Sequence, residues 1–135
     1  MQSYIFLVPA IGWFTAAFLK TLINFCYHRN YDLRLTFSNG GFPSAHTTTV
    51  ITVTSYIGFH DNFASTIFLL AECVSFIVII DATHLRRAIG KHAAILNKLN
   101  GRKALYEREG HSYVEVLAGI VIGTVIGYIC YLFIK

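Results

Sequence analysis

The segment GGFPSAHTTT, residues 40–49, combines a turn with residue types that can bind an anion and move a proton. Pro43 ends the turn, and Ser44 is a favourable N-cap for a helix that continues into an apolar run. A helix N-terminus carries free N–H groups and a partial positive charge, so this position is predicted to bind an anion, phosphate in particular. Gly41 lets the backbone approach a ligand closely, and His46 can pass a proton to that ligand. The alternative interpretation is an interfacial turn with a solvated histidine.

A second segment, HSYVEVLAG at residues 111–119, places His111 four residues before Glu115. On a helix these two side chains share a face. A carboxylate beside one imidazole nitrogen fixes the tautomer and leaves the other nitrogen free to attack. The alternative is an ordinary pair at the start of a helix. That alternative does not explain why two histidine segments and a set of arginines occur at one predicted membrane level.

The composition predicts a membrane protein in which both segments lie at the ends of spanning helices. Apolar residues make up 55% of the 135-residue chain and charged residues 13%, whereas a typical soluble domain has about 25% charged residues. The length suits one domain, residues 1–135. Four segments approach the roughly 20 apolar residues that cross a bilayer: Tyr4–Phe25, Ser44–Phe59, Phe63–Ile80 and Val114–Ile134. A tight turn at residues 60–62 joins the second and third.

A further helix is predicted between the third and fourth spans. The segment LRRAIGKHAAILNKL, residues 85–99, spaces its apolar residues as in a basic amphipathic helix that lies in the membrane interface. NGRKALYEREG, residues 100–110, is predicted to be a polar, mobile connection. The sequence therefore predicts an all-α fold, an integral membrane helical bundle of about four spans plus an interfacial amphipathic helix.

The basic residues predict the orientation. In a four-span bundle the connections 26–43 and 81–113 lie on the same side. Ten of the 11 Lys and Arg residues lie in these connections or at the adjoining end of the first span. The positive-inside rule places this side in the cytoplasm, so we expect a multi-pass membrane protein whose candidate site faces the cytoplasm. The same charges could instead serve to hold an anionic substrate.

Two features lie inside the predicted spans. Gly119, Gly123 and Gly127 are spaced four residues apart and form a small-residue face on the fourth span. This face is predicted to pack within the monomer or, alternatively, to form a homodimer contact. Glu72 lies in the middle of the third span, where an ionised carboxylate is costly. We therefore expect Glu72 to be protonated or paired inside the bundle.

The two histidine segments together resemble a known family. GGFPSAH is similar to the P-S-G-H element of the type-2 phosphatidic acid phosphatase superfamily, and HSYVEVLAG is similar to its last element, H-x3-D followed by V-L-A-G. The order GGFPSAH, DATHLRRAIGK, LN and GHSYVEVLAG resembles the divergent branch of that superfamily more closely, from about residue 12 to residue 123. The resemblance implies a membrane phosphatase that acts on a phosphomonoester.

The resemblance also implies roles for individual residues. His111 would be the nucleophile that forms a phosphohistidine, Glu115 would orient it in place of the usual aspartate, and His46 would be the general acid. The candidate phosphate-binding residues are Lys20, Arg34, Gly41, Ser44, Arg86 and Arg87, with Asp81 as a supporting residue. Positioned cations and amides suit phosphoryl transfer, since charge spreads over the equatorial oxygens. The choice between Arg86 and Arg87 stays open.

Several substrate classes remain open at this point. Phosphatidylglycerophosphate is the leading expectation by analogy with the divergent branch. The alternatives are phosphatidic acid, an isoprenoid phosphate, a soluble phosphate or polyphosphate, and a non-enzymatic membrane scaffold. The expected partners are a lipid phosphate and the membrane, with no nucleic acid. The superfamily's mechanism implies no cofactor, and the alternative is a metal site built from Asp81, His84, His111 and Glu115.

Overall fold

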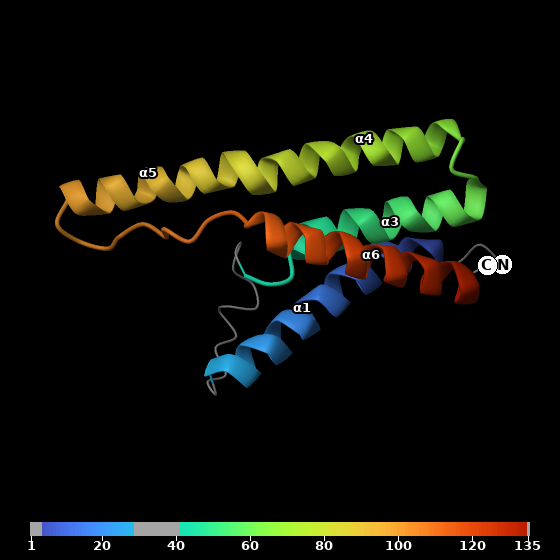
Figure 1. The fold of residues 1–135 in the computed structure, drawn as a ribbon, viewed down its shortest axis with the longest axis horizontal. Helices are drawn as coiled ribbons and strands as arrows, with labels where there is room; N and C mark the ends of the chain where they lie inside the picture. The colour runs from blue at the N-terminus through green and yellow to red at the C-terminus, as the bar shows by residue number, and fades with distance from the viewer. Residues whose placement is uncertain (1–3, 29–40, 135) are drawn as a thin grey trace.

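The computed structural model describes residues 4–28 and 41–134, and it shows a helical bundle (Figure 1). A short 3₁₀ helix, η1 (Ile5–Leu7), leads into α1 (Val8–His28). The remaining elements are α3 (Ala45–Asp61), α4 (Thr66–Ile80), the π-helix η2 (Asp81–Leu85), α5 (Arg86–Leu99) and α6 (Tyr113–Phe133). The described ranges contain no strand. The prediction of an all-α fold is therefore confirmed.

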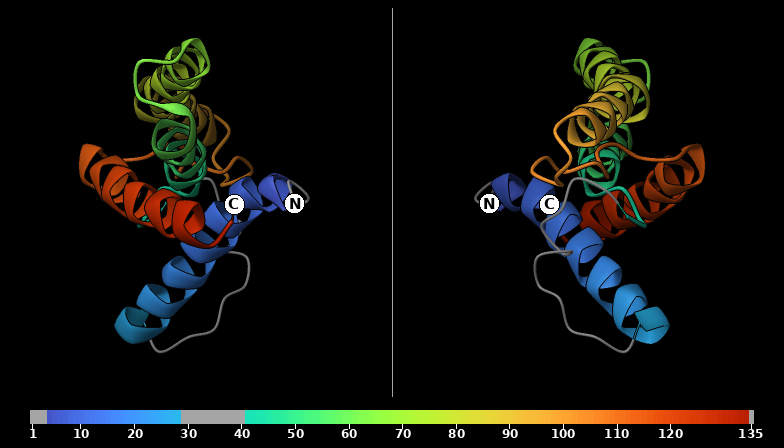
Figure 2. Two further views of the ribbon diagram at one scale, coloured as in Figure 1. Left: turned by 90° about the vertical axis from the view of Figure 1, so that its right-hand side faces the viewer. Right: turned by 90° about the vertical axis from the view of Figure 1, so that its left-hand side faces the viewer.

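The central helix is α3, which packs against α1, α4 and α6 (Figure 2). Its many threonines turn their hydroxyl groups back onto the helix: Thr48 Oγ1 donates to the carbonyl oxygen of Ser44 at 2.8 Å. Thr52 Oγ1 donates in the same way to the carbonyl oxygen of Thr48 at 2.7 Å. A hydroxyl that is satisfied locally leaves the methyl group of the threonine to pack. This is why α3 can be buried despite its polar composition.

The glycine face of α6 packs against α3. A Cβ atom at Gly123 would lie 2.7 Å from the carbonyl oxygen of Thr48, and one at Gly127 would lie 2.6 Å from that of Thr52. Gly119 is buried in the same contact. Small residues let the two backbones approach this closely. The prediction of packing within the monomer is confirmed, and a homodimer contact through these three glycines is wrong, because α3 covers their face.

Residues Thr66–Leu99 form one continuous helix of 34 residues, in which η2 is a π-helical turn between α4 and α5 (Figure 1). At 1.5 Å per residue this helix is about 50 Å long, whereas the bilayer core is about 30 Å thick. The helix predicted over residues 85–99 is present. It continues the line of α4, however, and is not a separate helix that turns to lie along the interface.

Within residues 4–28 and 41–134, three helices are long and apolar enough to cross a membrane: Ile5–Cys26, Thr66–Leu99 and Tyr113–Phe133. The second predicted span, Ser44–Phe59, corresponds to α3, which has 17 residues and lies among the other helices. Glu72 is exposed on α4. Its expected position inside the bundle is therefore wrong, because α4 contacts the other helices mainly through the face that meets α3.

The connection from α5 to α6 runs back along α5 (Figure 1). Asn97 is 5% exposed, and its Oδ1 accepts the N–H groups of Ala104 at 3.0 Å and Leu105 at 2.9 Å. Its Nδ2 donates to the carbonyl oxygen of Leu105 and to Glu107 Oε1, both at 2.8 Å. The prediction of a mobile connection is therefore wrong, because one buried amide holds this backbone against α5.

The bundle places its basic connection at one end, and we expect that end to face the cytoplasm. Asn100 caps α5 at this end, and Asn62 lies in the turn between α3 and α4 at the other end (Figure 1). After replacement of Cys26, Cys73 and Cys130, an impermeant maleimide added to intact cells should label Asn62→Cys and leave Asn100→Cys unlabelled. Labelling of Asn100→Cys alone would reverse the orientation.

Candidate functional site

The first turn of α3 begins at Ser44, which is buried and caps the helix as predicted. Its Oγ accepts the N–H of Thr47 at 3.4 Å, and its own N–H donates to the carbonyl oxygen of Glu115 at 3.1 Å. The second bond ties the start of α3 to the start of α6. In the described part of the chain, the N–H groups of Ala45 and His46 have no hydrogen-bond acceptor. They are the unpaired donors of a helix N-terminus and suit an anion.

Lys20 reaches this turn from α1. The residue is 6% exposed, and a Cβ atom at Gly41 would lie 3.0 Å from Lys20 Cε and 3.8 Å from its Nζ. Gly41 also has a φ of 100°, which favours glycine. The lysine interacts electrostatically with both Glu115 and His111. The structure therefore brings the predicted phosphate-binding lysine to the histidine–carboxylate pair.

The backbone of His111 is held by the π-helical turn. Its N–H donates to the carbonyl oxygen of Ala82 in η2 at 2.9 Å. Gly110, with a φ of 82°, lets the chain pass close to α5, because a Cβ atom there would lie 2.6 Å from the backbone nitrogen of Arg87. Sequence reasoning did not single out Ala82 or Gly110. A π-helical turn has no simple sequence pattern, whereas a glycine directly before a candidate histidine was a usable signal.

The side chains of His111 and Glu115 lie together, as their helical spacing predicts. His111 Nδ1 is 3.4 Å from Glu115 Oε2, and within the described residues Nδ1 makes no hydrogen bond. Glu115 Oε2 also accepts the N–H of Ser112 at 2.8 Å, and Ser112 Oγ accepts the N–H of Glu115 at 3.3 Å. This capping box holds the carboxylate at the start of α6. A carboxylate so placed favours a proton on Nδ1, which leaves Nε2 as the basic nitrogen.

The environment of His111 favours the neutral imidazole. The residue is 2% exposed, and burial lowers the pKa of His111 below its ordinary value of about 6.5. The positive charges of Lys20 and His46 act in the same direction, and Glu115 opposes them. A neutral imidazole is the nucleophilic form. His46 is exposed, so a ligand that approaches from outside meets His46 before it meets His111.

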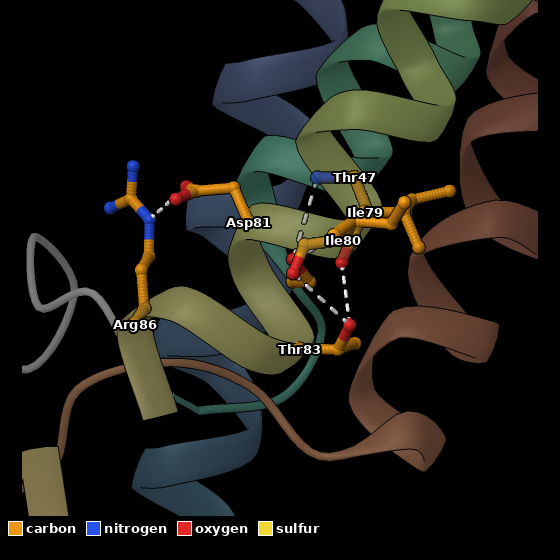
Figure 3. A network of polar contacts seen from close by, with 7 residues as sticks. Thr47, Ile79, Ile80, Asp81, Thr83 and Arg86 are labelled. Carbon is orange, nitrogen blue, oxygen red and sulfur yellow. Dashed lines mark hydrogen bonds and ion pairs between the residues drawn. The ribbon is translucent and has the colours of Figure 1, made fainter. Parts of the chain in front are cut away.

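The two candidate arginines have different surroundings. Asp81 and Arg86 point toward one another (Figure 3), with Arg86 Nε 2.6 Å from Asp81 Oδ2. Both side chains interact electrostatically with His46. The guanidinium carbon of Arg87 lies over the ring of Tyr113, 5.9 Å from its centroid. Of the two arginines that the sequence left open, Arg86 is therefore the one whose charge acts on a candidate catalytic histidine.

Two predictions about binding residues remain, the role of Arg34 and the alternative metal site. Arg34 lies outside the described residues. Within residues 4–28 and 41–134, no group of three or more His, Cys, Asp or Glu side chains is placed to hold a metal ion. The alternative metal site is therefore not assembled, and His84 Nδ1 instead lies 2.9 Å from Thr83 Oγ1.

The fold and this site define an integral membrane protein with a histidine–carboxylate pair at one end of its helices. The sequence matches the Divergent PAP2 family over residues 1–126, so the chain belongs to that family. It is 28% identical over 137 residues to the uncharacterized membrane protein YuiD of Bacillus subtilis (strain 168), covering 84% of this chain and 87% of that protein. No solved structure matches the chain significantly.

The Glu115 carboxylate offers a test of the pair. Glu115→Gln should keep the fold, because glutamine also serves in a capping box. It removes the charge that orients His111, so we expect turnover to fall by about 10²-fold or more. Glu115→Asp should be milder, because it retains the charge. Turnover of a phosphomonoester by purified variants measures both effects, and full activity of Glu115→Gln would remove the pair from the mechanism.

Proposed function

We propose that the protein is a membrane phosphatase that hydrolyses the phosphomonoester of a lipid through a phosphohistidine on His111. The observation that carries this proposal is the buried His111, which lies 3.4 Å from Glu115 and interacts electrostatically with Lys20 and with His46 at the start of α3. The pair supplies an oriented nucleophile. The lysine and the first N–H groups of α3 supply the positive potential that phosphate requires.

The proposed reaction has two steps. In the first, His111 Nε2 attacks phosphorus, the ester P–O bond breaks, and the leaving oxygen takes a proton from His46. In the second, water attacks phosphorus and gives a proton to His46, the P–N bond breaks, His111 is regenerated and inorganic phosphate is released. Lys20 and the first N–H groups of α3 stabilise the equatorial oxygens in both steps. Arg86, whose charge acts on His46, would contact the phosphate from the outer side.

The position of the site at one end of the helices suits a lipid substrate. The site lies where α3 and α6 begin, and α6 continues from it with mainly apolar residues, while threonine hydroxyl groups of α3 bond back onto that helix. A phosphate could therefore reach His111 from the interface while its apolar tail stays in the bilayer. Phosphatidylglycerophosphate is the leading substrate, by analogy with the divergent branch.

A phosphate-release screen of the purified full-length protein tests this function. The panel should contain phosphatidylglycerophosphate, phosphatidic acid, an isoprenoid phosphate, a short soluble phosphomonoester and polyphosphate, each with His111→Ala in parallel. We expect His111-dependent release from at least one lipid phosphate, at a higher kcat/KM than from the soluble substrates. Preference for a soluble substrate would favour a phosphatase of soluble phosphates or polyphosphate. No release from any substrate would favour a non-enzymatic scaffold.

A further inference from the structure

An apolar groove lies between α1, α3 and α4, and the catalytic proposal does not use it. It has a volume of about 360 Å³. Its lining includes Pro9 of α1, Val53 and Ile57 of α3, and Leu70 and Val74 of α4. Leu70 is 61% exposed and Val74 is 48% exposed. The groove is therefore open on the side of α4, which in a spanning helix is the side of the bilayer.

The few polar residues in the lining do not make the groove polar. Thr49 Oγ1 donates to the carbonyl oxygen of Ala45 at 2.8 Å. Thr54 Oγ1 contacts Ser75 Oγ at 2.8 Å and donates to the carbonyl oxygen of Ala71 at 3.2 Å. With these hydroxyl groups satisfied, the surface that faces the groove is hydrocarbon.

The groove begins one helical turn from His46 and lies on the face of α3 that carries this histidine. His46, Val50, Val53 and Ile57 are spaced by four, three and four residues, which places them along one face of a helix. The last three of them line the groove. His46, at the N-terminus of α3, therefore lies in line with the groove along this face.

The length and lining of the groove indicate one kind of occupant. From Thr49 to Ile57 the groove follows α3 for about 12 Å, roughly the length of ten methylene groups in an extended chain. This length and the apolar lining suit one hydrocarbon chain.

We propose that this groove holds one hydrocarbon chain of a lipid phosphate whose phosphate lies at the start of α3. The inference rests on the proposed function for the identity of the headgroup. Because the bilayer is as apolar as the groove, the groove adds little binding free energy. Its effect is to align the chain so that the phosphate lies against His46 and His111.

Photolabelling tests the groove without requiring turnover. The full-length protein carrying His111→Ala, in lipid nanodiscs, would be exposed to dodecyl phosphate with a diazirine near the middle of its chain. We expect labelling of α3 and α4 peptides. Dodecanol with the same diazirine should label these peptides less, because it lacks the phosphate. Labelling spread evenly over all lipid-facing helices, or equal labelling by the two probes, would overturn the proposal.

Variants that fill the groove provide the second measurement. Val53→Trp should reduce the specific labelling and lower the ratio of kcat/KM for hexadecyl phosphate to that for butyl phosphate by about tenfold or more. Leu70→Trp, at an exposed rim position, should act in the same direction without disturbing the core. Val121→Trp is the matched control, because Val121 is 58% exposed on α6 and does not line the groove. Val121→Trp should leave both the labelling and the kcat/KM ratio unchanged.

The outcomes separate this inference from the proposed function. Specific labelling of the groove in a protein that releases no phosphate would support the binding of a hydrocarbon chain in the groove and contradict the phosphatase activity. Suppose instead that turnover depends on His111 and that neither groove variant changes the ratio of kcat/KM for hexadecyl phosphate to that for butyl phosphate. This result would support the phosphatase activity and contradict the binding of a hydrocarbon chain in the groove.

Discussion

His111→Ala is expected to abolish turnover of every phosphomonoester, whether the leaving group is a lipid alkoxide or a phenolate. No change of leaving group bypasses the loss of a nucleophile, because the phosphoryl group then has no acceptor on the protein. Removal of a catalytic nucleophile in a well-studied hydrolase lowers kcat by about 10⁶-fold. We expect a loss of at least about 10⁴-fold here, measured as phosphate release from a lipid phosphate and from p-nitrophenyl phosphate.

Two comparisons keep this result interpretable. His92→Ala removes an exposed histidine from α5 and should retain activity, so it controls for a general effect of losing an imidazole. Thermal unfolding of His111→Ala should remain cooperative, because the backbone bond between residue 111 and Ala82 does not need the side chain. Activity of His111→Ala within tenfold of the wild type on either substrate would exclude the covalent mechanism.

His46→Ala is expected to lose activity in proportion to how much its substrate needs a proton. A lipid alkoxide is a poor leaving group and must be protonated in the transition state, whereas p-nitrophenolate leaves without that help. General acid catalysis is worth about 10²–10⁴-fold. We therefore expect a loss of this size in the first turnover of a lipid phosphate and a much smaller loss with p-nitrophenyl phosphate.

The comparison must follow the first turnover by rapid quench, because His46 would also assist the water that attacks the phosphohistidine. His60→Ala, which removes an exposed histidine at the far end of α3, is the matched control on the same helix. An equal loss on both substrates for His46→Ala would limit His46 to binding the phosphate.

Residue patterns were sufficient to predict the helices and the pairing of His111 with Glu115. Long apolar runs have few alternatives to helices in a bilayer, and a spacing of four residues fixes a shared face. The glycine spacing on α6 predicted a close helix contact, and its partner proved to be α3. Lys20 was placed by resemblance, and the structure brings it to the turn at Gly41 through the packing of α1 against α3.

The remaining features depend on contacts between segments that are distant in the sequence. The support of His111 by Ala82 requires the π-helical turn of η2, and local residue preferences do not specify such a turn. Asn97 orders residues 104–107 only because the connection folds back along α5. The exposed position of Glu72 follows from the location of α4 at the edge of the bundle. Hydropathy alone cannot distinguish an edge helix from a central one.

The most direct test of the central claim is to trap the phosphoryl group on the protein. The wild-type protein would be mixed with a lipid phosphate, quenched in alkali within the first turnover, and digested for mass spectrometry, since phosphohistidine survives alkali and is lost in acid. We predict a phosphoryl group on the peptide that contains His111, formed and consumed at rates compatible with turnover and missing from His111→Ala. Release of phosphate by a protein that never carries this group, or phosphorylation of a different residue, would contradict the account.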